Sequence, residues 1–317
     1  MYCFSRIVFL LTGLLIVSSN TVHAQTKTVF PPATLTLIQQ ELGEIPQLLL
    51  WLDAKSLRAS SFYTGMANTF GSVFQKFVTS STCVRKMKFA DFDYALLLGS
   101  DLETSKERGY LTVSGSFDAP KLLQCLSVEH KWTQTREGGV IIYQQTSGTT
   151  KSTIYAAGKN AFVMFEGTWV KPVTPNGNTL LSKGELSNFA TGSVLSFKYD
   201  APTGQEVKSA EGVANAGTDL SINGAVVFHK TKTAMEYQRK MEEAKKQIST
   251  LGLPVFKNLK ITRTNKRIDA EVSITTAEFV ILLNFLEQAI GNKNSSPTST
   301  PSVPTTPSPR VTPTTQP

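Results

Sequence analysis

Apolar residues in the first half of the chain recur at the spacings of short helices and strands. Leu35, Ile38 and Leu42 follow one another at steps of three and four, which predicts a short helix that ends at Gly43. An apolar stripe from Phe62 to Phe77 predicts a longer helix in the same way. Short apolar or alternating runs bounded by turn residues predict strands at 48–52, 92–98, 110–117, 132–136, 140–145, 153–157 and 161–165.

Two stretches of the chain share the order strand, helix, strand, strand. In the first, at about 110–145, Asp118 stands where it can cap the helix. In the second, at about 220–274, Thr233 and Glu236 form a predicted capping box at the start of the helix. The repeated order predicts an α+β fold of two halves, each containing a strand–helix–strand–strand unit. Mainly antiparallel sheets covered by helices are expected.

The boundaries of these halves follow from the segments between the predicted elements. Residues 171–183 are poor in apolar side chains and rich in turn formers, so we interpret them as the connection between an N-terminal half at 25–185 and a C-terminal half at 186–291. Residues 200–218 are polar and lack a periodic pattern, which predicts a surface loop. Thr275 and Glu278 form a second capping box before a helix that is apolar on several faces, a pattern typical of a buried helix.

The first 24 residues have the three parts of a secretory signal peptide. Arg6 precedes the apolar run Ile7 to Val17, and Val22 and Ala24 stand at the two positions that a signal peptidase reads. A retained membrane anchor is the alternative, but a spanning helix needs about 20 apolar residues. We therefore expect cleavage near Ala24 and a secreted or periplasmic protein without a transmembrane span.

Two cysteines, Cys83 and Cys125, remain once the signal peptide is removed. An even count in an exported chain predicts a disulfide between them, with two free buried thiols as the alternative. Closing a loop of this size stabilises a fold by roughly 4 kcal/mol in the chain-entropy model.

The last 26 residues, 292–317, are dominated by 7 Pro, 7 Thr and 5 Ser. Such a composition cannot bury enough apolar surface to offset its ordering entropy, so we predict a disordered tail. The same composition occurs in O-glycosylated stalks and in unmodified spacers, and the sequence leaves both open.

Net charge and motifs exclude several classes of function. The chain carries 32 Lys and Arg against 24 Asp and Glu, a formal charge of +8, which is too mild an excess for the basic footprint of a nucleic-acid-binding protein. The sequence contains no Cys-x-x-Cys pair, no nucleophile elbow and no phosphate-binding loop. No catalytic, cofactor-binding or metal-binding residue is predicted.

A few polar residues are weaker candidates for chemistry. Arg263, Lys266 and Arg267 lie at or near a predicted hairpin tip, where they could contact an anionic partner or simply be solvated. Asp91 and Asp93 are two residues apart and are predicted to share one side of a strand. A solvated strand start is the simpler interpretation of that pair.

These observations favour an exported, non-catalytic binding or structural protein of the cell envelope. Its partner would be a protein or a polysaccharide of the envelope, and no motif identifies which. The alternative is an exported hydrolase whose site is assembled from scattered carboxylates or Ser and His. Convergence of Asp91, Asp93 or His229 in one concave pocket would favour the hydrolase.

Overall fold

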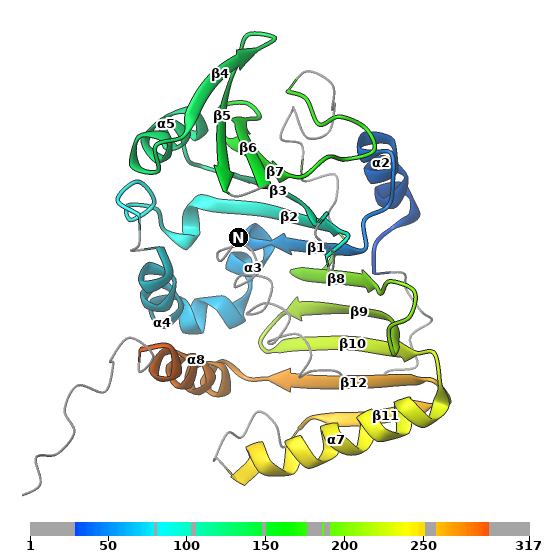
Figure 1. Ribbon diagram of the computed structural model, residues 1–317. Coiled ribbons are helices and arrows are strands. Elements are labelled where there is room, and N and C mark those ends of the chain that lie inside the picture. Colours follow the sequence, from blue (N-terminus) through cyan, green and yellow to red (C-terminus); the bar gives the residue numbers. More distant parts are fainter. Residues whose placement is uncertain are drawn as a thin grey trace, which may run out of the picture.

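A single antiparallel sheet of twelve strands organises the chain (Figure 1). The computed structural model describes residues 29–78, 81–102, 106–147, 150–175, 186, 191–250 and 258–291. The spatial order of the strands is β11-β12-β10-β9-β8-β1-β2-β3-β7-β6-β5-β4. Their bounds are β1 Leu48–Asp53, β2 Phe92–Ser100, β3 Arg108–Gly115, β4 Thr133–Glu137, β5 Val140–Ser147, β6 Thr150–Ala156, β7 Ala161–Glu166, β8 Leu195–Asp200, β9 Val207–Ala216, β10 Leu220–Phe228, β11 Lys260–Thr264 and β12 Arg267–Ile274.

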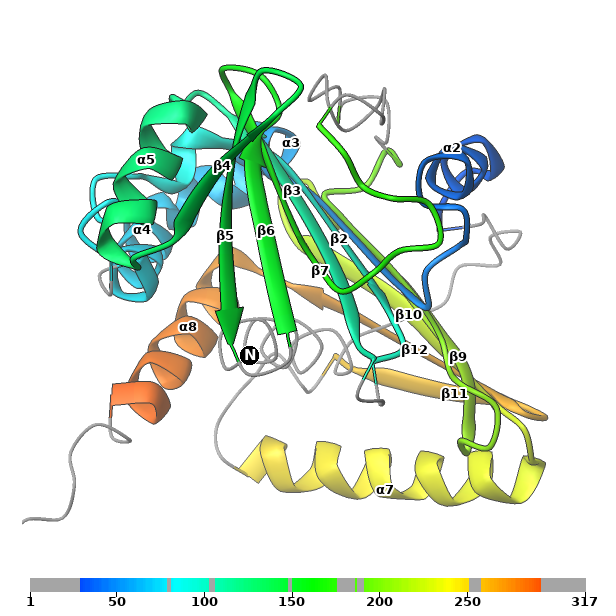
Figure 2. The same ribbon diagram turned by 45° about the horizontal axis from the view of Figure 1, so that its top comes forward.

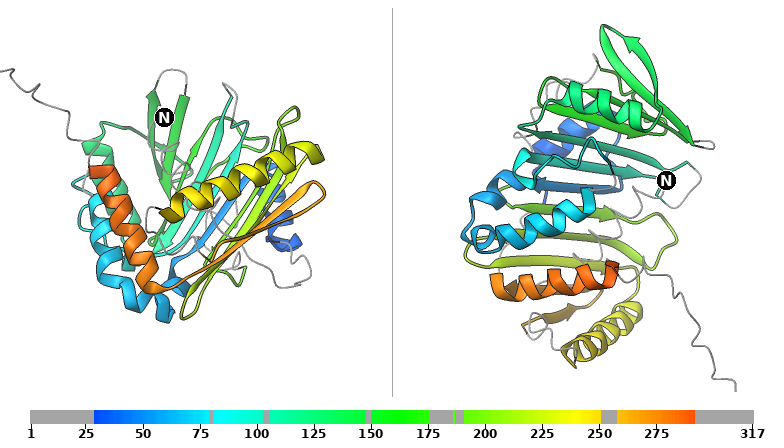
Figure 3. Two further views of the ribbon diagram at one scale, coloured as in Figure 1. Left: turned by 90° about the horizontal axis from the view of Figure 1, so that it is seen from below. Right: turned by 90° about the vertical axis from the view of Figure 1, so that its left-hand side faces the viewer.

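Helices lie on both faces of this sheet. Helix α2 lies on one face, called here the α2 face, and α4, α7 and α8 lie on the opposite one, the α7 face (Figure 3). Helix α5 also packs on the α7 face, through Leu123 against Tyr143 and Ile154. The helix bounds are α2 Pro32–Leu42, α3 Ala54–Ala59, α4 Ser61–Val78, α5 Ala119–Glu129, α7 Thr231–Thr250 and α8 Thr276–Gly291, with a short 3₁₀ turn, η1, at Phe89–Asp91.

The local signals that begin and end these elements are largely the predicted ones. Gly43 ends α2 with a φ of 81°, in the left-handed region that suits glycine. The Asp118 carboxylate accepts a hydrogen bond from the Lys121 amide at 3.1 Å and caps α5. At α8, the Thr275 amide donates to the Glu278 carboxylate at 2.9 Å and the Glu278 amide donates to the Thr275 hydroxyl at 3.3 Å, which confirms the predicted capping box.

Two predictions about the C-terminal half are wrong. The segment predicted as a loop at 200–218 contains the ten-residue strand β9. Its inward positions are small: Gly212 lies against the Phe197 ring, where a Cβ would clash, and Ala214 is buried. Small side chains leave no apolar alternation to detect. Helix α7 begins at Thr231, so Thr233 lies inside its first turn and does not cap the helix.

The structure contains the predicted helices and large antiparallel sheet but does not confirm the duplication. In the second unit, β10 pairs directly with β12. In the first unit, β3 pairs with β7, and β6 separates β7 from β5. Element order therefore recurs without a common pairing pattern. The predicted halves also share one sheet, because β1 pairs with both β2 and β8.

Some predictions fall outside the described residues. The signal peptide, the Ser/Thr/Pro-rich tail and most of the predicted connection between the halves belong to this group. Among the helices that the structure does describe, none has the length and apolar character needed to cross a membrane.

Candidate binding cavity

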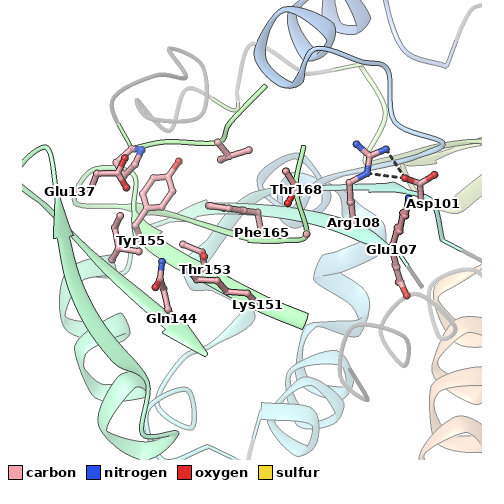
Figure 4. Close-up of a pocket in the computed structure, with 15 residues that line it drawn as sticks. Asp101, Glu107, Arg108, Glu137, Gln144, Lys151, Thr153, Tyr155, Phe165 and Thr168 are labelled. Atoms are coloured by element: carbon pink, nitrogen blue, oxygen red, sulfur yellow. Dashed lines mark hydrogen bonds and ion pairs between the residues drawn. The ribbon is translucent and has the colours of Figure 1, made fainter. Parts of the chain in front are cut away.

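A cavity of about 620 Å³ opens on the α2 face, over strands β5, β6 and β7. Its floor includes Lys151, Thr153 and Tyr155, which alternate along β6 and therefore point to the same face of the sheet. Gln144 and Phe165 lie beside Thr153 on the neighbouring strands, since Gln144 and Phe165 are its direct partners in the register. Figure 4 shows these side chains between Glu137 at one end and Arg108 with Asp101 at the other. We call this space the sheet cavity.

One side of the sheet cavity is formed by the segment 167–175, called here the wall segment. It leaves the end of β7 and reaches α2 (Figure 2). Trp169 anchors the segment in the core with only 3% of its surface exposed. The Lys171 amide donates to the Leu42 carbonyl at 2.9 Å, so the segment is also fixed to the end of α2.

Arg108 connects the wall segment to two other loops. Its guanidinium forms ion pairs with Glu44 at 2.6 Å and with Asp101 at 2.8 Å. It also lies 5.3 Å from the centroid of the Trp169 ring, within cation–π range. These contacts fix Arg108 between the wall segment and the two loops, so Arg108 helps to hold the cavity in shape.

The Tyr155 hydroxyl is buried and has no hydrogen-bond partner among the described residues. Burial raises the pKa of this phenol far above its usual value, and the nearby carboxylates of Glu41 and Glu137 add to the shift. Tyr155 is therefore a neutral donor and acceptor. An unpaired buried hydroxyl destabilises a fold by about 1–3 kcal/mol, and a bound water or ligand would relieve that cost.

Four further polar side chains of the cavity are not engaged with the rest of the protein. Glu137, Gln144, Lys151 and Thr153 all line the sheet cavity. Their side chains form no hydrogen bond or ion pair with any residue that the structure describes. Glu137 and Lys151 are exposed, so water can satisfy them, whereas Thr153 is buried. A few polar groups that converge on one concave space are a feature of ligand sites.

The charges that line the cavity balance. Asp101, Glu107 and Glu137 are acidic, and Lys106, Arg108 and Lys151 are basic. Burial raises the pKa of Glu107, and the like charge of Glu166 raises it further. The lining of the cavity thus carries charges of both signs that sum to no net charge.

The predicted disulfide is confirmed, and it lies away from the sheet cavity. Cys83 and Cys125 are joined with a Cα–Cα distance of 5.7 Å, which ties the loop after α4 to helix α5. Beside it, the Glu129 carboxylate accepts hydrogen bonds from the Ser81 hydroxyl at 2.8 Å and the Thr82 amide at 3.1 Å. These bonds, the Ser81 hydroxyl first, lower the pKa of Glu129.

The predicted basic contact residues lie on one hairpin but not on one face. Arg263 stands opposite Ile268, which is buried on the α7 face, and its guanidinium donates to Gln238 of α7 at 3.1 Å. Arg267 lies on the α2 face, where it pairs with Asp269 at 2.7 Å. Lys266 is in the turn between them. Contact of all three with one anionic partner stays a prediction, and the partner would have to reach around the hairpin tip.

The residues proposed for a hydrolase do not converge. Asp91 lies in the turn η1, not on the strand as predicted, and its carboxylate accepts from the Lys88 amide at 2.7 Å. Asp93 pairs with Arg58 at 2.7 Å. His229 is exposed at the end of β10. Among the described residues, no group of three or more His, Cys, Asp or Glu side chains is placed to hold a metal ion.

Sequence reasoning missed every residue of the sheet cavity. The signal that was available is the stretch Lys151 to Tyr155, in which polar side chains occupy the alternate positions of a strand. That pattern normally marks a solvated face. Only the wall segment, which is distant in sequence, turns this polar face into an enclosed space.

Comparisons with known proteins do not identify the chain. No protein-family model and no curated protein matches its sequence. Among solved structures, the chain is similar to crystal form I of TP0453, with 12% sequence identity and a TM-score of 0.43. The match covers 76% of this chain and 94% of that chain. A TM-score of this size carries no argument, so the function has to be inferred from the residues themselves.

Proposed function

We propose that the protein is an exported, non-catalytic binding protein of the cell envelope and that the sheet cavity is its ligand site. One observation carries the proposal: Glu137, Gln144, Lys151 and Thr153 line a cavity of about 620 Å³ and have no hydrogen-bond or ion-pair partner among the described residues, and the buried Tyr155 hydroxyl beside them has none there either. That volume lies within the range of about 300–1,000 Å³ that small-molecule sites occupy.

Export is supported by two independent features. The first 24 residues have the composition of a signal peptide. The Cys83–Cys125 disulfide is of the kind that persists in oxidising compartments and is rare in the cytosol. The cell envelope is therefore where we expect the ligand to be found.

A cavity-filling substitution tests the proposal. We expect the mature chain, residues 25–317, to show a raised Tm with at least one member of a panel of polar probes: neutral trisaccharides, a sulfated disaccharide, a tripeptide and a nucleoside monophosphate. Thr153→Phe places a ring in the cavity and should abolish that shift.

The matched control is Thr262→Phe, which changes an exposed threonine on strand β11, far from the cavity in the sheet order. It should leave the shift unchanged. If no probe raises the Tm of the wild-type chain, or if Thr153→Phe retains the full shift, the sheet cavity is not the ligand site.

A further inference from the structure

We propose that the sheet cavity recognises a short, uncharged oligosaccharide; this inference rests on the proposed function of the cavity. Lys151, Thr153 and Tyr155 form a line along β6 that spans about 14 Å at the usual rise per residue. A ligand that touches the whole line must be extended and must offer polar groups along its length.

The charge balance of the cavity disfavours strongly anionic ligands. Phosphate and sulfate groups are normally held by convergent cations, most often by arginine forks. The arginine that lines this cavity, Arg108, is already held by Glu44 and Asp101. Lys151 alone would face the ligand from the floor, and Glu137 would repel an anion near Tyr155.

The unpaired polar groups disfavour apolar ligands. An acyl chain in the cavity would bury Glu137, Gln144 and Lys151 without partners, and each such burial costs free energy that dispersion contacts do not return. It would also leave the Tyr155 hydroxyl without a partner.

The position of the cavity within the sheet disfavours an extended peptide. Peptides that bind sheets commonly add a strand to a free edge, where backbone groups supply the hydrogen bonds. The floor strand β6 is paired with β5 on one side and with β7 on the other, so it has no free edge. On the floor of the cavity, recognition therefore depends on side chains.

A sugar chain matches what these side chains offer. Its hydroxyl groups both donate and accept, which suits Lys151 as a donor, Glu137 as an acceptor, and Gln144, Thr153 and Tyr155 as either. The Phe165 ring and Ile142 add an apolar patch on the same floor, against which the C–H face of a pyranose can lie. Each sugar hydroxyl would thus take the place of a water molecule on a polar side chain that has no partner among the described residues.

Calorimetric titration of the mature chain with neutral trisaccharides, a sulfated disaccharide and a tripeptide tests the ligand class. We expect a neutral trisaccharide to bind more tightly than either other class. Tyr155→Phe and Gln144→Ala should each weaken its binding about 5- to 10-fold, as expected for loss of one hydrogen bond.

Two matched variants on the opposite face of the same strands serve as controls. Tyr143→Phe lies against α5, and Gln145→Ala lies where its side chain accepts from Trp132, so neither should alter binding. Tyr155→Phe without sugar should be at least as stable as the wild-type chain, because it removes an unpaired hydroxyl.

The outcomes separate the two proposals. Tighter binding of the tripeptide or of the sulfated sugar, lost in Thr153→Phe, would overturn the oligosaccharide assignment and leave the binding site in place. Trisaccharide binding that is unchanged in both Tyr155→Phe and Gln144→Ala would also overturn the assignment. No binding by any probe would overturn both proposals.

Discussion

The two ends of the α2 face differ in how they satisfy their polar side chains. One row of directly paired residues crosses this face from β5 to β11: Ile142, Tyr155, Val163, Thr112, Leu96, Trp51, Ser196, Val213, Asn223, Glu271 and Lys260. Within this row the residues from β5 to β1 are mostly apolar, and most of those from β8 to β11 are polar. The change of character coincides with the passage from β1 to β8, where α2 no longer covers the sheet (Figure 3).

On the open end, polar side chains pair with one another. Arg267 contacts Asp269 at 2.7 Å and Glu211 at 3.4 Å, and Lys198 pairs with Asp200. On the covered end, Glu137, Gln144, Lys151 and Thr153 have no such partners among the described residues. Water satisfies exposed groups at either end, including Glu137 and Lys151, whereas Gln144 is only partly exposed and Thr153 is buried in the floor of the cavity. This contrast between the two ends supports the proposal of a ligand site at the covered end.

The largest expected effect concerns the wall segment. Trp169→Ala removes a buried ring that contacts Tyr110 and Arg108. We expect a loss of about 5 kcal/mol in the free energy of unfolding, at the upper end for a buried aromatic side chain. Urea denaturation monitored by circular dichroism measures it. A loss below about 1 kcal/mol would show that the covered end does not depend on this anchor.

A second contrast is that between the helices that cover the two ends of the α7 face, and removal of the disulfide tests it. Helix α5 has eleven residues, of which Ala119 and Leu123 are the buried ones, whereas α7 has twenty. Because α5 buries so little, we expect the Cys83–Cys125 bond to stabilise the fold by about 4 kcal/mol for its 42-residue separation. Urea denaturation of Cys83→Ser/Cys125→Ser measures this, and an unchanged midpoint would contradict it.

A pair of identical substitutions compares the two ends directly. Arg108→Ala removes the cation that pairs with Glu44 and Asp101 in a site where the arginine is 14% exposed, so we expect a loss of about 3 kcal/mol. Arg267 is 35% exposed, and Arg267→Ala should cost no more than about 1 kcal/mol. If both variants lost the same free energy of unfolding in urea denaturation, the covered end and the open end would not differ in how strongly they depend on their ion pairs.

The sequence is most informative where each residue's neighbour is close in the chain. The alternation of Ile268, Ala270 and Val272 predicts the burial of β12 correctly, and the cap residues Asp118 and Thr275 lie where the helices begin. These signals depend on one strand or one turn, so they can be recognised without knowing the fold.

The sheet cavity could not be predicted in this way. Its residues come from β4, β5, β6, β7, the start of β3 with the loop before it, and the wall segment, which meet only because the chain places β7 between β3 and β6. Strand β9 was missed for a related reason: Gly212 has no side chain because the Phe197 ring of the neighbouring strand occupies that space. In both cases the determining contact is between segments that only the completed sheet brings together.

The smallest expected effect is a pH-dependent one beside the disulfide. Hydrogen bonds from Ser81 and from the Thr82 and Cys83 amides lower the pKa of Glu129 in the folded protein below its ordinary value of 4.5. A lowered folded-state pKa means that the stabilisation is present above the unfolded-state pKa and is lost as the pH falls through the folded-state value. Glu129→Gln should therefore lower the urea midpoint more at pH 7 than at pH 3. A matched Glu278→Gln variant removes a carboxylate that caps a different helix, α8. If Glu129→Gln lowered the midpoint equally at both pH values, the charge of Glu129 would not be what holds this loop to α5.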